Sequence, residues 1–228
     1  MPYPIKVSWK TEILPLAMVI AALSLGAYFY PRFPETVVTH WNIQGEPNGY
    51  MGRLGGAFVI PGLLAVMYLL FLVLPALDPK SERYAEFGKV YQILKNGILA
   101  TLLAIYAAAG FYNLGYPVKI NAIVPWLVGL LLIVIGNYMG KLKRNWFVGV
   151  RTPWTLSSEN AWNKTNRASG YLMMLFGLAV IVTPYLPKAW GLWVFIGAAA
   201  LMLLGSLIYS YVVYRRERRA NNGVIVRQ

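Results

Sequence analysis

Six long apolar segments constrain the fold of this chain more than any other feature of its sequence. Each has about 18 residues or more, the length that an α-helix needs to cross a hydrocarbon core of roughly 30 Å. Because lipid offers no hydrogen-bond partner to a backbone, a segment that crosses it alone has to be helical. The sequence therefore predicts an all-α integral membrane protein with six transmembrane helices. The predicted spans are residues 13–30, 56–77, 93–112, 122–140, 168–186 and 191–214.

The composition agrees with this class and narrows the chemistry. Hydrophobic residues make up 58% of the 228 residues, more than a soluble domain usually holds. With no cysteine, one histidine and eight acidic residues, the chain offers no thiolate, no metal-ligand cluster and no credible nucleophile with its base. We therefore expect no enzyme activity, no cofactor and no metal site. One alternative stays open, a catalytic pairing of Ser157 or Ser158 with Lys164.

The net charge of +13 would suit nucleic acid, but the cations lie at the ends of the apolar spans and not on one basic domain. We therefore expect no direct nucleic-acid binding. Sixteen of the 21 Lys and Arg residues fall on the side of the membrane that holds both termini, four fall on the other side, and Lys95 lies within a span. This excess of cations predicts that both termini are cytoplasmic.

Several residues within the spans depart from a plain apolar helix. Pro61 and Pro75 are expected to bend the second helix without ending it. Lys95 is a functional candidate, because ionisable groups within a membrane are costly. It lies near the end of its span, however, and we expect its side chain to snorkel to the interface. Gly136 and Gly140 form a pair that lets another helix approach closely.

The first loop, residues 31–55, carries the only histidine, His40, and a turn is expected at residues 48–49. A lone histidine is weak support for catalysis, so we expect His40 to bond across the loop or to lipid headgroups. The predicted orientation places this loop outside the cell. Elsewhere, residues 81–92 are predicted to begin a helix that continues into the third span, and residues 220–228 to be disordered.

The loop between the fourth and fifth spans, residues 145–167, is rich in tryptophan and polar residues. Pro153 disfavours helix at the residue before it, while Ser157 or Ser158 can cap the next helix with Glu159 in its first turn. We therefore expect an ordered loop. Its tryptophans and cations suit either the headgroup level of a membrane or a recognition surface, and both interpretations stay open.

Two stretches resemble a known family. Residues 136–170 read GNYMGKLKRNWFVGVRTPWTLSSENAWNKTNRASG and are similar to the signature of the SdpI family of bacterial membrane immunity proteins. Residues 34–50 read PETVVTHWNIQGEPNGY and resemble a domain of unknown function that precedes this signature in many members. One position departs from the pattern. Members usually carry histidine where this chain has Asn166, so the resemblance implies no titrating or metal role there.

The resemblance implies a bacterial, multi-pass protein of the cytoplasmic membrane, in contact with membrane lipid. Characterised members confer immunity to a secreted peptide toxin and can hold a cytoplasmic repressor at the membrane, so we expect a toxin and a transcriptional repressor as partners. The alternative is a small transporter or channel. It is favoured by the prolines within spans and by residues 40–50 and 161–171, which share Trp, Asn, Gly and Tyr at equal spacing, as in an inverted repeat.

We expect two halves, residues 1–112 with the outward loop and residues 113–228 with the family signature, and one interaction surface in each. The predicted outer surface comprises His40, Trp41, Asn42, Gly45, Glu46, Gly49 and Tyr50. The predicted inner surface comprises Asn145, Trp146, Gly149, Arg151, Thr152, Pro153, Trp154, Trp162, Lys164 and Arg167.

Overall fold

The computed structural model describes residues 4–42 and 45–225 of the chain. Within these residues, six helices are long and apolar enough to cross a membrane, which confirms the predicted fold class. A two-stranded hairpin accompanies them. The elements in chain order are α1 (Trp9–Phe29), β1 (Thr36–Trp41), β2 (Pro47–Gly52), α2 (Arg53–Leu77), the short 3-10 helix η1 (Ser81–Arg83), α3 (Tyr84–Asn113), α4 (Ile120–Met139), α5 (Pro153–Ser157), α6 (Glu159–Val182), the 3-10 helix η2 (Thr183–Tyr185) and α7 (Lys188–Ile225).

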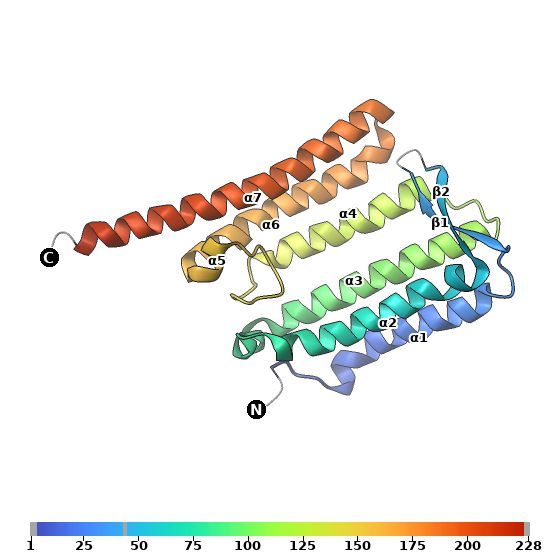
Figure 1. Cartoon of the computed structure of the whole chain (residues 1–228), viewed down its shortest axis with the longest axis horizontal. Helices are drawn as coiled ribbons and strands as arrows, with labels where there is room; N and C mark the ends of the chain where they lie inside the picture. The colour runs from blue at the N-terminus through green and yellow to red at the C-terminus, as the bar shows by residue number, and fades with distance from the viewer. Residues whose placement is uncertain (1–3, 43–44, 226–228) are drawn as a thin grey trace.

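The six long helices lie side by side and alternate in direction (Figure 1). Both termini, η1 and α5 lie at one end of the bundle, which we call the terminal end. The hairpin, the α3–α4 connection and η2 lie at the other, the hairpin end. Helices α1, α2 and α3 pack on one another, α4, α6 and α7 form a second group, and α3 and α4 join the two. The division into halves after residue 112 stays a prediction.

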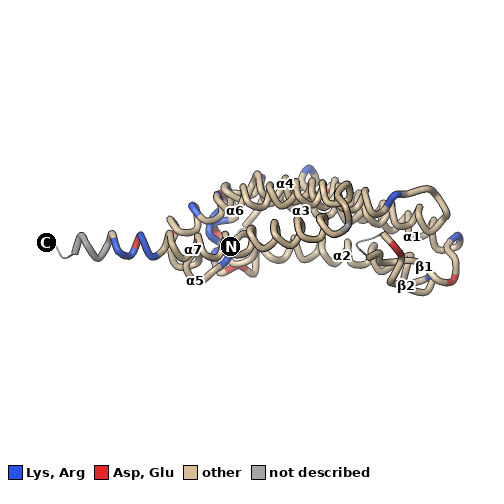
Figure 2. The backbone as a smooth tube through the Cα atoms, turned by 90° about the horizontal axis from the view of Figure 1, so that it is seen from above, with Lys and Arg blue, Asp and Glu red and all other residues tan. Residues whose placement is uncertain are grey.

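Helix α7 extends past the other helices at the terminal end, and this extension carries a run of Lys and Arg residues (Figure 2). Residues 220–225 are part of it, so the predicted disorder of this stretch is wrong, while residues 226–228 lie outside the described residues. The suggested inverted repeat also loses its basis. Residues 40–50 include the end of β1 and most of β2, whereas residues 161–171 are helical.

The closest packing joins α4 and α6 through glycine. A Cβ atom at Gly136 would lie 2.6 Å from the Gly170 carbonyl oxygen, and a Cβ at Gly129 would lie 2.5 Å from that of Gly177. Small residues are what allow two backbones to come this near in a membrane. The predicted close approach at Gly136 is confirmed. Gly140, the other member of the predicted pair, has only ordinary contacts, and Gly129 takes its place.

The hairpin replaces the loop predicted for residues 31–55. Strands β1 and β2 pair antiparallel, with Val37 opposite Met51. The turn predicted at residues 48–49 lies inside β2, and the chain reverses before it, near Gly45, whose φ of +79° favours glycine. The stretch TVVTHW of β1 is rich in β-branched and aromatic residues, which favour a strand. This composition was the sequence signal for the hairpin, which was not predicted.

Two predicted helix starts are confirmed. Helix α6 begins at Glu159, and the Ser158 hydroxyl accepts a hydrogen bond of 3.0 Å from the Ala161 N–H. Because the cap lies at Ser158, the last part of the predicted loop, residues 159–167, is helical. Helix α3 follows η1 directly and runs through the third span, with a kink at Phe87.

Helix α2 continues through both of its prolines, as predicted. A proline has no N–H for the carbonyl four residues earlier, which for Pro75 is that of Phe71 and for Pro61 that of Ala57. Both carbonyls find a donor on α3. The Tyr91 hydroxyl donates to the first at 2.7 Å, and the hydroxyl of Tyr106 donates to the second at 2.6 Å. Neighbouring tyrosines therefore supply the hydrogen bonds that the prolines remove.

Lys95 does not snorkel to the interface. Its side chain is fully buried, and its ammonium lies 2.6 Å from a carboxylate oxygen of Glu12. The Gln92 amide approaches the other oxygen at 3.5 Å, and the ammonium lies 5.7 Å from the centre of the Tyr68 ring. The predicted first span excluded Glu12, but α1 begins at Trp9 and carries the acid into the bundle. Pairing opposite charges lowers the cost of burying each of them.

Tyr91→Phe is expected to destabilise the bundle by about 1–3 kcal/mol, because it leaves the Phe71 carbonyl without a donor. In a Pro75→Ala background the new backbone N–H can donate to that carbonyl, so the same substitution should cost much less. The measurement is the free energy of unfolding in mixed detergent and denaturant for the four proteins of this cycle. An equal cost of Tyr91→Phe in both backgrounds would contradict the assignment.

Candidate functional site

At the terminal end, the loop between α4 and α6, residues 140–158, is built around Asn145. This side chain is fully buried. Its Oδ1 accepts hydrogen bonds from the N–H groups of Phe147 (2.8 Å) and Val148 (2.7 Å), and its Nδ2 donates to the carbonyl oxygens of Lys143 (2.8 Å) and Val148 (3.0 Å). Four bonds from one amide hold the backbone in a tight turn. Asn145 therefore shapes the loop and does not face a partner.

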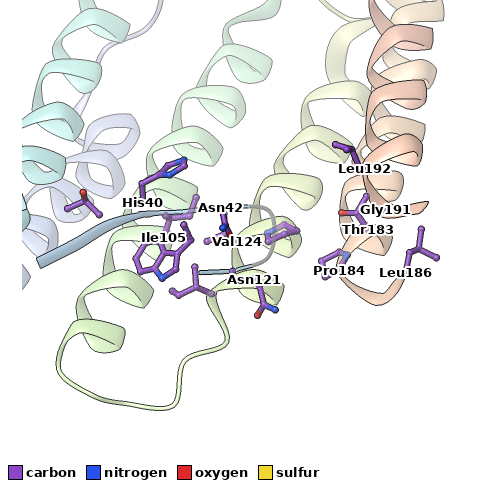
Figure 3. A pocket seen from close by; sticks show the side chains of 15 residues that line it. His40, Asn42, Ile105, Asn121, Val124, Thr183, Pro184, Leu186, Gly191 and Leu192 are labelled. Carbon is purple, nitrogen blue, oxygen red and sulfur yellow. The ribbon is translucent and has the colours of Figure 1, made fainter. Parts of the chain in front are cut away.

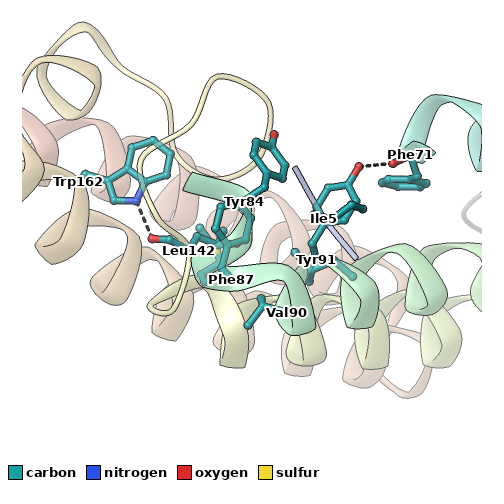
Figure 4. Packing of buried hydrophobic residues seen from close by; sticks show 10 residues of the cluster. Ile5, Phe71, Tyr84, Phe87, Val90, Tyr91, Leu142 and Trp162 are labelled. Carbon is teal, nitrogen blue, oxygen red and sulfur yellow. Dashed lines mark hydrogen bonds between the residues drawn. The ribbon is translucent and has the colours of Figure 1, made fainter. Parts of the chain in front are cut away.

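Gly149 and two side chains of α6 seat the loop on that helix. The φ of Gly149 is +111°, and a Cβ there would lie 2.7 Å from Asn166 Oδ1. This oxygen accepts a bond of 2.8 Å from the Val150 N–H. The Trp162 indole N–H donates to the Leu142 carbonyl at 2.8 Å (Figure 4). Both side chains are fully buried, so Trp162 anchors the loop from beneath.

Thr152, Pro153 and Trp154 connect the loop to α7. Thr152 is the N-cap of α5; its hydroxyl accepts a backbone N–H of the first turn at 3.2 Å and lies 3.2 Å from the Ser210 hydroxyl of α7. Pro153 is the first residue of the helix, where a missing N–H has no cost. The Trp154 ring packs on that of Tyr211, with 5.1 Å between centroids.

Five of the predicted inner residues are exposed: Trp146, Arg151, Pro153, Lys164 and Arg167. Trp146 is 48% exposed. The Arg151 guanidinium donates to the Trp146 carbonyl at 2.6 Å, and the side chain is exposed. These residues are the exposed part of the predicted inner surface.

The serine and lysine pairing considered from the sequence is not formed. The Ser158 hydroxyl donates to Glu217 at 2.5 Å, and the Ser157 hydroxyl donates to the Trp154 carbonyl at 3.1 Å. Lys164 lies exposed on α6. Among the described residues, no three His, Asp or Glu side chains are placed to hold a metal ion together. The hydroxyls of Ser157 and Ser158 are therefore used in the fold.

Asp78, which the sequence did not single out, ties this loop to the first group of helices. One carboxylate oxygen of the nearly buried side chain accepts from the Trp146 N–H at 2.8 Å and from the Tyr84 hydroxyl at 3.0 Å. Arg83 adds a second link through two bonds to Glu159, of 2.8 and 3.4 Å. An acid directly after an apolar span was the only sequence signal for this contact.

Asp78→Asn is expected to loosen the loop. The Trp146 N–H and the Tyr84 hydroxyl both donate to the carboxylate, and an amide group would offer its own N–H donors there in place of one acceptor oxygen. Amide exchange over residues 145–151 should speed up on the order of tenfold, the equivalent of about 1.4 kcal/mol. Hydrogen-exchange mass spectrometry measures this, and Glu82→Gln, an exposed acid of η1, is the control that should change nothing. Exchange in Asp78→Asn that matches the control would contradict the anchoring role.

At the hairpin end, a cavity of about 450 Å³ lies between the hairpin, α4 and the η2–α7 turn (Figure 3). Its size falls within the range of roughly 300–1,000 Å³ found for ligand pockets. A Cβ at Gly45 would lie 2.8 Å from the Asn121 Cβ, so glycine brings the hairpin tip against α4. The predicted outer residues in the wall are His40, Trp41, Asn42 and Gly45, and residues that the sequence did not indicate include Asn121, Val124, Thr183, Pro184 and Leu192.

Trp41 lines this cavity and carries a buried hydrogen-bond donor. Its ring meets that of Tyr112 edge to face, with 5.1 Å between centroids. The indole Nε1 is buried and has no hydrogen-bond partner among the described residues. A buried N–H without an acceptor has a free-energy cost, which an acceptor on a bound molecule would relieve.

The other predicted outer residues hold the hairpin itself. His40 Nδ1 lies 2.5 Å from Asn48 Oδ1, the bond across the loop that was expected. A Cβ at Gly49 would lie 2.7 Å from the His40 Cβ, so glycine is required there. The Glu46 carboxylate accepts a hydrogen bond of 3.0 Å from the side-chain amide of Asn42. Tyr50 is exposed. These three residues, Glu46, Gly49 and Tyr50, lie outside the cavity wall.

Comparison with known proteins matches both of these regions. Residues 141–210 match the SdpI/YfhL protein family, and residues 17–65 match a domain of unknown function, DUF1648. The chain is 26% identical over 207 residues to the Immunity protein SdpI of Bacillus subtilis (strain 168), and the match covers 91% of this chain and 97% of that protein. No solved structure matches the chain significantly.

With six helices of membrane-spanning length and composition, the chain is a multi-pass helical membrane protein. The two family matches and the nearly full-length relative confirm the resemblance to the SdpI/YfhL family seen in the sequence. The homology supports a membrane immunity protein.

Proposed function

We propose that this protein protects a bacterial cell against a secreted peptide toxin, which it binds at the hairpin end. The observation that carries the proposal is the match to Immunity protein SdpI over 91% of the chain. In this proposal the protein lies in the cytoplasmic membrane and acts by binding, without catalysis. The terminal end faces the cytoplasm, as the distribution of cations predicts, and reports the bound state to a transcriptional repressor.

The chemistry of the hairpin-end cavity supports a peptide ligand. Its wall combines apolar side chains with the hydroxyls of Thr39 and Thr183, the amide of Asn121 and the free indole N–H of Trp41. Among the described residues of the wall there is no Lys, Arg, Asp or Glu. A backbone carbonyl of an uncharged peptide segment would satisfy the indole, and tryptophan is the residue that most often anchors such interfaces.

The terminal end supports the reporting step. Its exposed Trp146 and Arg151 belong to a loop held rigid by internal hydrogen bonds, so a partner meets one fixed surface. Asp78 and Arg83 join that loop to α2 and α3, and α3 also contacts β1 of the hairpin. A contiguous set of packed elements therefore runs between the two ends, a route through which binding at one end can be coupled to the other.

The transporter or channel alternative draws on the buried Glu12–Lys95 pair, since ionisable residues within membranes often mark ion pathways. Each charge of the pair is bonded to the other, and neither lines the hairpin-end cavity. The pair therefore acts on helix packing, and binding remains the better explanation of the site.

Trp41→Ala should weaken toxin binding by about 2 kcal/mol or more, roughly 30-fold, because it removes an aromatic anchor from the cavity wall. Arg151→Ala should leave toxin binding nearly intact and impair the inward step, since the two residues lie at opposite ends of helices that cross roughly 30 Å of hydrocarbon. Survival of a sensitive bacterium against a panel of secreted peptide toxins is measured together with toxin binding and membrane level for each variant.

The matched control is Trp193→Ala, which removes a tryptophan that is 67% exposed on α7 near the same end and should leave binding unchanged. Equal loss of binding in properly inserted Trp41→Ala and Arg151→Ala would overturn the separation of the two ends. Unchanged survival in both, at normal membrane level, would remove these surfaces from the function.

A further inference from the structure

A second cavity lies at the terminal end, between α4, α6 and α7, in a region that neither the hairpin site nor the exposed loop surface uses. Its volume is about 410 Å³, and nearly all of its wall is apolar. Its wall includes Met139, the last residue of α4, and Thr152 of the loop, both at the terminal end. It also includes Met173 of α6 and residues 202–204 of α7, which lie farther from that end along their helices. The cavity therefore runs from the membrane boundary into the hydrocarbon, along α6 and α7.

Three hydroxyls belong to the wall, and one of them has no partner. The Thr152 hydroxyl is bonded to Ser210, and the Ser206 hydroxyl donates to the carbonyl of Met202 in its own helix at 2.6 Å. Ser169 is only 2% exposed, and its Oγ has no hydrogen-bond partner among the described residues. A buried hydroxyl in an apolar cavity calls for an acceptor oxygen on whatever fills the cavity.

Exposed arginines follow the lining residues of this cavity at the terminal end; the Arg218 guanidinium lies 5.8 Å from the centre of the Tyr214 ring. Arg151 directly precedes Thr152 of the wall. Arg215 and Arg218 are exposed on α7, two to three turns beyond the lining residues, and side chains of a helix lean toward its N-terminus, which here is back toward the membrane. The one acid among them, Glu217, is already bonded to Ser158 and Asn160 of the α6 start. The rim is therefore cationic, and guanidinium groups bind phosphate through paired hydrogen bonds.

We propose that this cavity binds one anionic phospholipid from the leaflet at the terminal end. An acyl chain fills the apolar part along Met173 and α7, an ester carbonyl accepts the hydrogen bond of Ser169, and the phosphate lies among the arginines of the rim. The site follows from cavity, hydroxyl and charge together, and it does not depend on the toxin proposal. It makes the lipid a structural ligand that joins α6 and α7, the two helices behind the loop.

The test uses the full chain purified in mild detergent and depleted of lipid, with phosphatidylglycerol and phosphatidylcholine of identical chains as the probes. Native mass spectrometry should show one phosphatidylglycerol retained, with weaker retention of phosphatidylcholine. Ser206→Phe should lower phosphatidylglycerol affinity by about tenfold or more, because the ring occupies the cavity while the lost hydroxyl bonded only its own helix. Ile208→Phe, at a position 60% exposed on the lipid side of α7, is the matched control and should bind normally.

Two further variants separate the parts of the site. Ser169→Ala should weaken phosphatidylglycerol binding by about fivefold through loss of one hydrogen bond, and it leaves the cavity free, so it remains informative if Ser206→Phe does not fold. Arg215→Gln combined with Arg218→Gln should remove the preference for phosphatidylglycerol over phosphatidylcholine. Equal retention of the two lipids by the unaltered protein would overturn the proposal, as would equal binding by Ser169→Ala, Ile208→Phe and the unaltered protein.

Discussion

Hydrocarbon offers no hydrogen-bond partner, so every polar group that enters the bundle has to be satisfied by another part of the chain. Pro61 and Pro75 free two carbonyls of α2, and tyrosine hydroxyls of α3 bond both. Lys95 of α3 meets Glu12 of α1 in the same way. Apolar contacts alone would let these three helices slide against one another, since lipid is as apolar as their side chains. The polar pairs fix which residues face each other, and they give the two ends a rigid frame.

The frame places two different surfaces about a membrane thickness apart. At one end, Gly45 brings the hairpin against α4, and the bond between His40 and Asn48 holds the two strands together. The wall of the cavity there includes Trp41, whose indole N–H is unpaired among the described residues. At the other, Asn145 and Asn166 use their amides to hold a loop that carries exposed cations. Asp78 links this loop to the helices that support the hairpin. In the proposed function, the cavity binds the toxin and the loop reports the bound state.

Much of this arrangement could be predicted from local sequence. The lengths of the apolar segments predicted the six helices, and the pair Ser157 and Ser158 predicted where α6 begins. The contacts that define the sites join residues far apart in the chain, and no periodicity shows them. Lys95 was expected at the interface because it lies near the end of its predicted span. Its partner, Glu12, lies 83 positions away in the chain, so no local pattern indicates the pair. The predicted inner surface included Asn145 and Trp162, and Asn166 was noted only as a departure from the family's sequence pattern. All three side chains are buried and support the loop. Asn121 and Thr183 carried no signal until the fold brought them to one cavity.

The central claim is that a secreted toxin enters the hairpin-end cavity from outside the cell, and photo-crosslinking in intact cells tests it most directly. A photoreactive p-benzoylphenylalanine is placed at Thr183, in the cavity wall, or at Trp146, exposed at the terminal end. The probe is a tagged form of the peptide toxin against which expression of the protein protects. The account predicts a crosslink from position 183 and none from position 146. A crosslink from position 146 alone, or none from 183 in cells that are protected, would contradict it.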